Sequence, residues 1–155
     1  MTVSPLLRPQ RYPHRWLAAA AAAIAATAHL PVIGPHLEQA PYMGTLFILL
    51  TVVCLTLAIA MIRYDTPAVY LAAAATCGAA VIGYALTRLI PFPLLADDVG
   101  NWLEPLGVLS VLTETTVFAL AGAALQAAAR QHNTAPDQSR FAAASNQPRH
   151  VANER

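Results

Sequence analysis

The sequence predicts an all-α membrane protein, folded as a bundle of four transmembrane helices. Hydrophobic residues make up 57% of the 155 residues and charged residues only 11%, a composition unlike that of a soluble domain of this size. The apolar residues gather in four blocks, each near or above the roughly 20 residues that a helix needs to cross hydrocarbon. These blocks are residues 16–33, 42–62, 67–90 and 102–129. None shows the regular polar stripe of a water-facing helix.

The elements follow in order from a basic arm over residues 1–15, which we expect to be mobile and to lie against lipid headgroups. After the first helix, Pro31, Pro35 and Pro41 predict a rigid turn, because proline nitrogens cannot donate to a continuing helix. Thr66 and Pro67 are typical of the cap and first position of the third helix. The transmembrane domain thus spans residues 16–129, and the polar segment 130–155 is expected to be a disordered tail.

The connection over residues 90–105 is the most distinctive of the chain. Its apolar first half could dip into the membrane interface. Asp97, Asp98 and Asn101 are expected to cap and charge the start of the fourth helix, whose amino-terminal end is the positive end of its dipole.

Arginine residues orient the predicted bundle. All nine basic residues are arginines, and only Arg88 falls on the side of the first and third connections. The other eight precede the first block, separate the second from the third, or follow the fourth. By the positive-inside rule both termini are cytoplasmic, and the predicted location is the bacterial inner membrane.

A minority interpretation treats the first block as a secretory signal. A basic start, an alanine-rich core and Ala26-Thr27-Ala28 resemble a signal peptide and its cleavage site. Cleavage would leave His29 as a new amino terminus, able to chelate copper. The block also pairs naturally with the second helix, which favours a retained span.

Several function classes lack their residues. The formal net charge is +1 and no basic run is interleaved with aromatic residues, so no nucleic-acid partner is expected. Cys54 and Cys77 do not form a CxxC pair and are expected to pack as small apolar residues. Motifs for zinc proteases, serine hydrolases and phosphate loops are also missing. Enzymatic activity is therefore not favoured, and no cofactor is implied.

One group of polar residues predicts a site near the outer face. Glu114 lies in the fourth apolar block, where a carboxylate costs several kcal/mol unless it is neutralised, paired or hydrated. Arg88 is its expected partner, although the two residues lie at different depths. The pair closes only if the fourth helix begins well above the membrane plane, or if Tyr84 and a water connect the two side chains. His29 could complete the group. The candidate ligand-binding residues are Arg88, Glu114, Tyr84, His29, Asp97 and Asp98.

Structural interpretations compete with each of these assignments. Arg88 and Glu114 could form an ion pair that only fixes helix register. The two aspartates could be simple capping acids, and His29 a satisfied interfacial histidine. A metal site formed by His29, His36 and Glu38 is a separate possibility.

The segments 29–42 and 87–114 resemble a group of small, uncharacterised four-helix integral membrane proteins of GC-rich bacteria. The resemblance covers about two thirds of the chain. It implies the four-helix fold and carries no activity with it. The residues Ile90-Pro91-Phe92-Pro93 depart from the group, in which a glycine is expected in this loop.

Three hypotheses for function remain. The leading one is a non-enzymatic accessory or small-ligand or ion-binding protein with an outer-facing polar pocket. The second is a small, dimeric transporter or proton-coupled carrier, since four helices alone give a cramped pathway. The third is a metal-handling membrane protein that uses His29, His36 and Glu38. The expected partners are the lipid bilayer and either a second copy of the chain or a membrane-complex subunit.

Overall fold

The computed structural model describes the backbone of residues 4–145 and the side chains of residues 4–131. This part of the chain is all-helical, as predicted, and contains no strand. Its α helices are α1 (Arg15–Gln39), α2 (Pro41–Arg63), α3 (Pro67–Leu89) and α4 (Pro105–Ser145). Two short 3-10 helices, η1 (Pro5–Leu7) and η2 (Ala96–Asp98), complete it. All four α helices contain a stretch that is long and apolar enough to cross a membrane.

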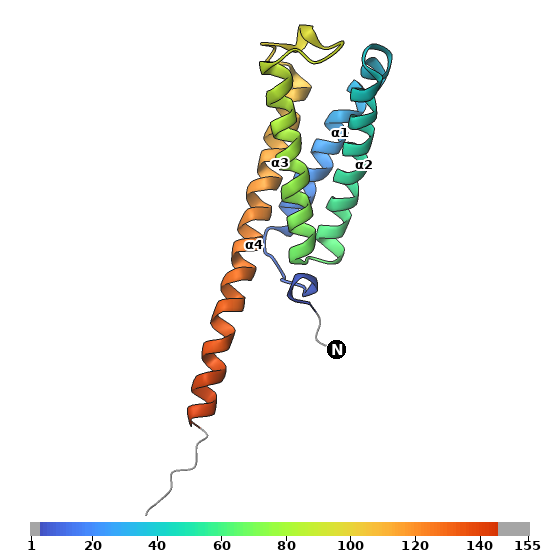
Figure 1. Ribbon diagram of the computed structural model, residues 1–155. Coiled ribbons are helices and arrows are strands. Elements are labelled where there is room, and N and C mark those ends of the chain that lie inside the picture. Colours follow the sequence, from blue (N-terminus) through green and yellow to red (C-terminus); the bar gives the residue numbers. More distant parts are fainter. Residues whose placement is uncertain (1–3, 146–155) are drawn as a thin grey trace, which may run out of the picture.

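The helices form two antiparallel hairpins. α1 packs along α2, α3 packs along α4, and α1 also packs against α4, whereas α2 and α3 share fewer contacts. Figure 1 shows the hairpins close together at the lower end of the bundle and diverging toward the upper end. The lower end holds the amino-terminal segment and the α2–α3 turn, and α4 also runs out toward that side. The upper end holds the α1–α2 and α3–α4 connections.

Small residues on α1 allow close helix packing in the lower half of the bundle. Ala18, Ala22 and Ala25 are at most 1% exposed, and the larger Met61 and Tyr70 fill the space beside them. Side chains with little volume let backbones approach, which is the main source of helix association in lipid. Because the two hairpins pack closely only at the lower end, a space remains between them at the upper end.

The rigid turn predicted at Pro31 and Pro35 is wrong. Both prolines lie inside α1, which continues to Gln39. Each proline removes one hydrogen bond to the carbonyl four residues before it. A helix with two lost bonds still satisfies more of its backbone than a loop would in hydrocarbon, so the helix continues. Only Pro41 behaves as expected, since α1 ends just before it and α2 starts there.

The amino-terminal segment is attached to the lower end of the bundle and is not a free arm. The Asp65 Oδ2 atom accepts a hydrogen bond from the Tyr12 amide at 2.9 Å and lies 3.3 Å from Arg15 Nη1. The Gln10 amide donates to the Asp65 carbonyl, and the Tyr70 hydroxyl donates to Asp65 Oδ1 at 2.6 Å. Asp65 is 4% exposed, so these contacts neutralise and solvate a buried carboxylate. One turn residue thereby connects residues 10–15 to α3.

α4 begins later in the chain than predicted, and a different residue caps it. α4 starts at Pro105, and the Glu104 carboxylate accepts the Gly107 amide hydrogen at 2.7 Å. Asp97 and Asp98 lie on η2 and Asn101 lies before the cap position, so these three residues do not cap α4. The loop folds back on α3 through the Gly100 amide, which donates to the Arg88 carbonyl. Gly100 has φ +80°, a backbone conformation that residues with a side chain rarely adopt.

α4 extends past the predicted block that ends at residue 129. Its backbone is helical to Ser145, through the first part of the segment predicted as a tail. Residues 146–155, the rest of that segment, lie outside the described residues. The disordered tail stays a prediction.

Candidate functional site

A cavity of about 620 Å³ lies between the diverging hairpins in the upper half of the bundle. All four α helices and the α3–α4 loop contribute to its lining. The walls are mainly apolar, with α2 contributing Leu46, Phe47 and Leu50. Its ionisable and hydroxyl-bearing side chains are His29, His36, Thr76, Tyr84, Thr87, Arg88, Asp98, Glu104, Ser110 and Glu114. The structure thus brings together five of the six candidate ligand-binding residues, all except Asp97.

A buried pair, His29 and Glu114, lies in this lining. His29 Nε2 is 3.1 Å from Glu114 Oε1, and the two residues are 4% and 1% exposed. His29 lies ten residues before the end of α1 at Gln39, and Glu114 lies nine residues after the start of α4 at Pro105. At about 1.5 Å per residue, these positions have matching depth. The continuation of α1 through its prolines therefore places an imidazole beside the carboxylate.

The predicted Arg88–Glu114 pair does not form. Arg88 is the penultimate residue of α3, at the upper end of the bundle, and its Nη1 atom lies 3.0 Å from Asp98 Oδ1. The same atom donates to the Asp98 carbonyl at 3.3 Å. The difference in depth that the sequence already indicated is real, and a nearby loop carboxylate binds the guanidinium instead.

Arg88 and Tyr84 together fix the roof of the cavity. The guanidinium carbon lies 4.7 Å from the centre of the Tyr84 ring, within the range of cation–π attraction. The Tyr84 hydroxyl donates to the Trp102 carbonyl at 2.9 Å. A side chain on Gly107 would come within 2.6 Å of the Tyr84 ring, so only glycine permits this packing of α3 on α4. Arg88 Nε is buried and has no hydrogen-bond partner among the described residues.

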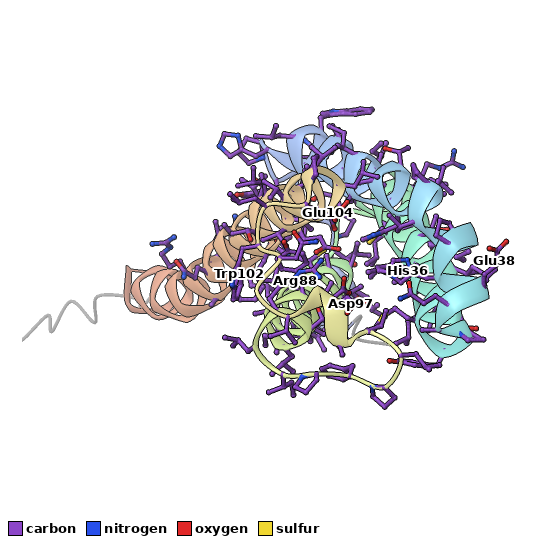
Figure 2. All side chains as sticks on the ribbon, turned by 90° about the horizontal axis from the view of Figure 1, so that it is seen from above. His36, Glu38, Arg88, Asp97, Trp102 and Glu104 are labelled. Carbon is purple, nitrogen blue, oxygen red and sulfur yellow. The ribbon has the colours of Figure 1, made fainter. Side chains whose placement is uncertain are left out.

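The predicted metal set is not assembled. Within residues 4–131 no group of three His, Cys, Asp or Glu side chains could hold a metal ion. His36 turns toward the bundle and its Nδ1 atom hydrogen-bonds to the Val32 carbonyl at 2.7 Å, whereas Glu38 points away from the bundle (Figure 2). The continuing helix separates these two side chains, because residues two apart on a helix face different directions. Asp97 is exposed on η2 and does not line the cavity.

Sequence reasoning missed both Phe47 and the capping role of Glu104. The Phe47 ring stacks on His29 with centroids 5.5 Å apart and meets the His36 ring edge-on at 4.9 Å. Nothing distinguishes Phe47 from other apolar residues of α2 in the sequence. Glu104 could have been found, because a glutamate directly before a helix-initiating proline is placed to cap the helix. The expectation for Cys54 and Cys77 is confirmed insofar as both are buried free thiols.

The Glu114 carboxylate and the His29 imidazole are in contact in the inner part of a largely apolar cavity. The Arg88 guanidinium, which the α3–α4 loop binds through Asp98, lies at the upper end of the same cavity. Such a chamber can hold a small molecule by its apolar walls and orient it by a few polar groups. No protein-family model matches the chain, and searches of curated proteins and of solved structures give no match either.

Proposed function

We propose that this chain is an integral inner-membrane protein that binds a small ligand in the cavity around His29 and Glu114. The contact between these two side chains, in the lining of a cavity, carries the proposal. An ionisable pair removed from water is costly, and its desolvation is only partly offset by mutual attraction. A pair that served packing alone would be expected inside a closed core.

The size and lining of the cavity support a ligand. Its volume of about 620 Å³ falls within the roughly 300–1,000 Å³ of small-molecule sites. Gly83 lies in the lining, and a Cβ atom added there would meet nothing within 4 Å. The lining therefore leaves open space beside Gly83 of α3.

Charge supports an orientation with both termini in the cytoplasm. Arg8, Arg11, Arg15 and Arg63 lie at the lower end or before it, and Arg130 lies on the extension of α4 beyond the predicted span. Arg88 belongs to the upper end. The positive-inside rule then assigns the lower end to the cytoplasm and places the cavity toward the outer face.

Filling the cavity tests the proposal. Gly83→Phe places a ring in the chamber, whereas Gly122→Phe places the same ring in open space on α4, outside the lining. Protein gently extracted from membranes would be analysed by native mass spectrometry for a co-purifying small molecule. We expect the bound mass with the wild type and with Gly122→Phe, and its loss with Gly83→Phe. No bound mass in the wild type, or equal occupancy in both variants, would contradict the proposal.

A dimeric carrier is the second candidate, because α3 is poorly covered. Only 17% of its apolar membrane-spanning window is buried inside the chain. A second copy packed on α3 would enclose the open side of the cavity. If the protein is a carrier, reconstituted wild-type protein should transport the bound molecule, and Glu114→Gln should fold but not transport it.

A further inference from the structure

The chamber described above is negatively charged. Asp98, Glu104 and Glu114 contribute carboxylates to its lining, and Arg88 is the one permanently charged cation there among the described residues. His29 and His36 are the titratable groups that face it from α1. With both histidines neutral the carboxylates exceed the cations by two, and a proton on His29 leaves an excess of one. An anion entering this chamber would meet net repulsion, which is strong where the dielectric constant is low.

The single cation is already paired with a carboxylate through one of its nitrogen atoms. Arg88 contacts Asp98 at 3.0 Å on one side and lies 4.7 Å from the centre of the Tyr84 ring. Both contacts hold it at the roof, next to the α3–α4 loop. Arg88 Nε has no hydrogen-bond partner among the described residues, but an anionic head group bound there would lie beside the Asp98 carboxylate and be repelled by it.

Glu114, by contrast, has capacity left. Its Oε1 atom is 3.1 Å from His29 Nε2, and no other donor among the described residues reaches the carboxylate. The residue is 1% exposed and lines the cavity, and His29 is the one hydrogen-bond partner of its carboxylate among the described residues. A carboxylate buried in this way attracts a positive charge more strongly than one in water does.

Aromatic and apolar groups cover the rest of the chamber. Phe47 and Tyr84 contribute rings from α2 and α3, and ring faces attract cations that have shed their water. Leu46 and Leu49 line the cavity and are also 53% and 59% exposed on the outer surface of α2. The chamber therefore adjoins the surface that would face hydrocarbon, beside the divergence of α2 and α3 (Figure 1).

We infer that the ligand is a lipophilic organic cation, which enters from the bilayer between α2 and α3 and places its charge near Glu114. This inference rests on the proposed function and names its ligand class. Bulky apolar substituents would contact the leucine-rich wall of α2. A small hydrated metal ion fits the site poorly, because no three His, Cys, Asp or Glu side chains among the described residues are placed to hold one.

Two ions of matched size and opposite charge test the inference without any substitution. Tetraphenylphosphonium and tetraphenylborate would be compared by equilibrium dialysis against the purified full-length protein, with Gly83→Phe as the blank for partition into detergent. Each ion would be measured alone, because the two precipitate together, and we expect saturable binding of the phosphonium by the wild type and no saturable binding of the borate. Equal or tighter binding of the borate would overturn the assignment.

Variants then locate the charge. Glu114→Gln keeps the shape of the side chain and is expected to weaken phosphonium binding at least about tenfold, since one opposing charge is lost at low dielectric. Glu38→Gln is the matched control, because Glu38 is exposed and points away from the bundle (Figure 2). Unchanged affinity in a folded Glu114→Gln protein would contradict the role of Glu114.

The two proposals fail in different ways. If a co-purifying molecule is lost in Gly83→Phe but the phosphonium neither binds nor displaces it, the cavity is a ligand site and the cationic class is wrong. If filling the cavity changes no bound mass and the phosphonium does not bind, both proposals fail.

Discussion

Asp65 joins three parts of the lower end of the bundle through one side chain. It receives hydrogen bonds from the Tyr12 amide and the Tyr70 hydroxyl and forms an ion pair with Arg15. Its φ of +46° is one that aspartate tolerates better than most residues. The residue is therefore important both for the turn and for the attachment of the amino-terminal segment.

Asp65→Ala should destabilise the protein by about 2 kcal/mol, because the Tyr70 hydroxyl is left buried without an acceptor. The released segment should also become sensitive to trypsin at Arg11, whereas the bond after Arg8 precedes proline and resists the enzyme. Thermal unfolding in detergent and limited proteolysis would measure both effects. Asp97→Ala is the control, since Asp97 is an exposed acid of the upper end. Wild-type resistance to trypsin in Asp65→Ala would contradict the described attachment.

The His29–Glu114 pair predicts a non-additive double-mutant cycle. His29→Leu should cost about 3 kcal/mol, because it leaves a buried carboxylate without its partner. Glu114→Leu should lower the free energy of unfolding by less, since burying an unpaired neutral imidazole costs less than burying an unpaired carboxylate. The double variant should be more stable than His29→Leu alone. Unfolding free energies in a single detergent would give the coupling energy, and strict additivity would show that the two side chains do not interact.

At the scale of helices, glycine distinguishes close packing from open surface. A Cβ atom on Gly44 would lie 2.7 Å from the Leu37 backbone nitrogen, whereas one on Gly34 meets nothing within 4 Å. Gly44→Ala should therefore force α1 and α2 apart near their turn, at a cost of about 1–3 kcal/mol. Gly34→Ala should be neutral or stabilising by up to about 1 kcal/mol, because alanine favours helix. Equal midpoints of thermal unfolding for the two variants would contradict this packing.

The helices were predictable from composition because a bilayer leaves little choice. A run of about 20 apolar residues without charges has to satisfy its backbone internally, so the positions of α2 and α3 match the predicted blocks within one residue at each end. The end of α1 was not predictable by the rules for soluble proteins. Those rules stop a helix at proline, and here the helix continues past Pro31 and Pro35.

The candidate site was predictable in part of its membership and not in its pairings. A buried glutamate, a nearby arginine and a histidine indicated one polar cluster, and the structure gathers these residues around one cavity. The pairing of these side chains depends on how deep in the bundle each residue lies along its helix. The continuation of α1 and the fold of the α3–α4 loop determine these depths, and neither is encoded in local sequence patterns. The contribution of Phe47 depends on packing alone.

For the whole molecule, the charge distribution predicts a topology that thiol labelling can measure. Cys54 and Cys77 are buried, so single cysteines introduced elsewhere should be labelled against a low background. Asn101→Cys, at the exposed upper loop, should react with an impermeant maleimide in intact cells. Ser4→Cys, at the exposed lower end, should react only after the membrane is opened. The reverse pattern would invert the orientation and place the cavity toward the cytoplasm.

The central claim is that His29 and Glu114 meet at a ligand cavity within the membrane. Solid-state NMR of histidine-labelled protein in lipid bilayers tests it most directly, with the His29 ring assigned by its loss in His29→Gln. We predict that the ¹⁵N resonance of His29 shifts in Glu114→Gln and also when tetraphenylphosphonium is added to the wild type. A His29 resonance that responds to neither change would show that the imidazole lies apart from both the carboxylate and the ligand.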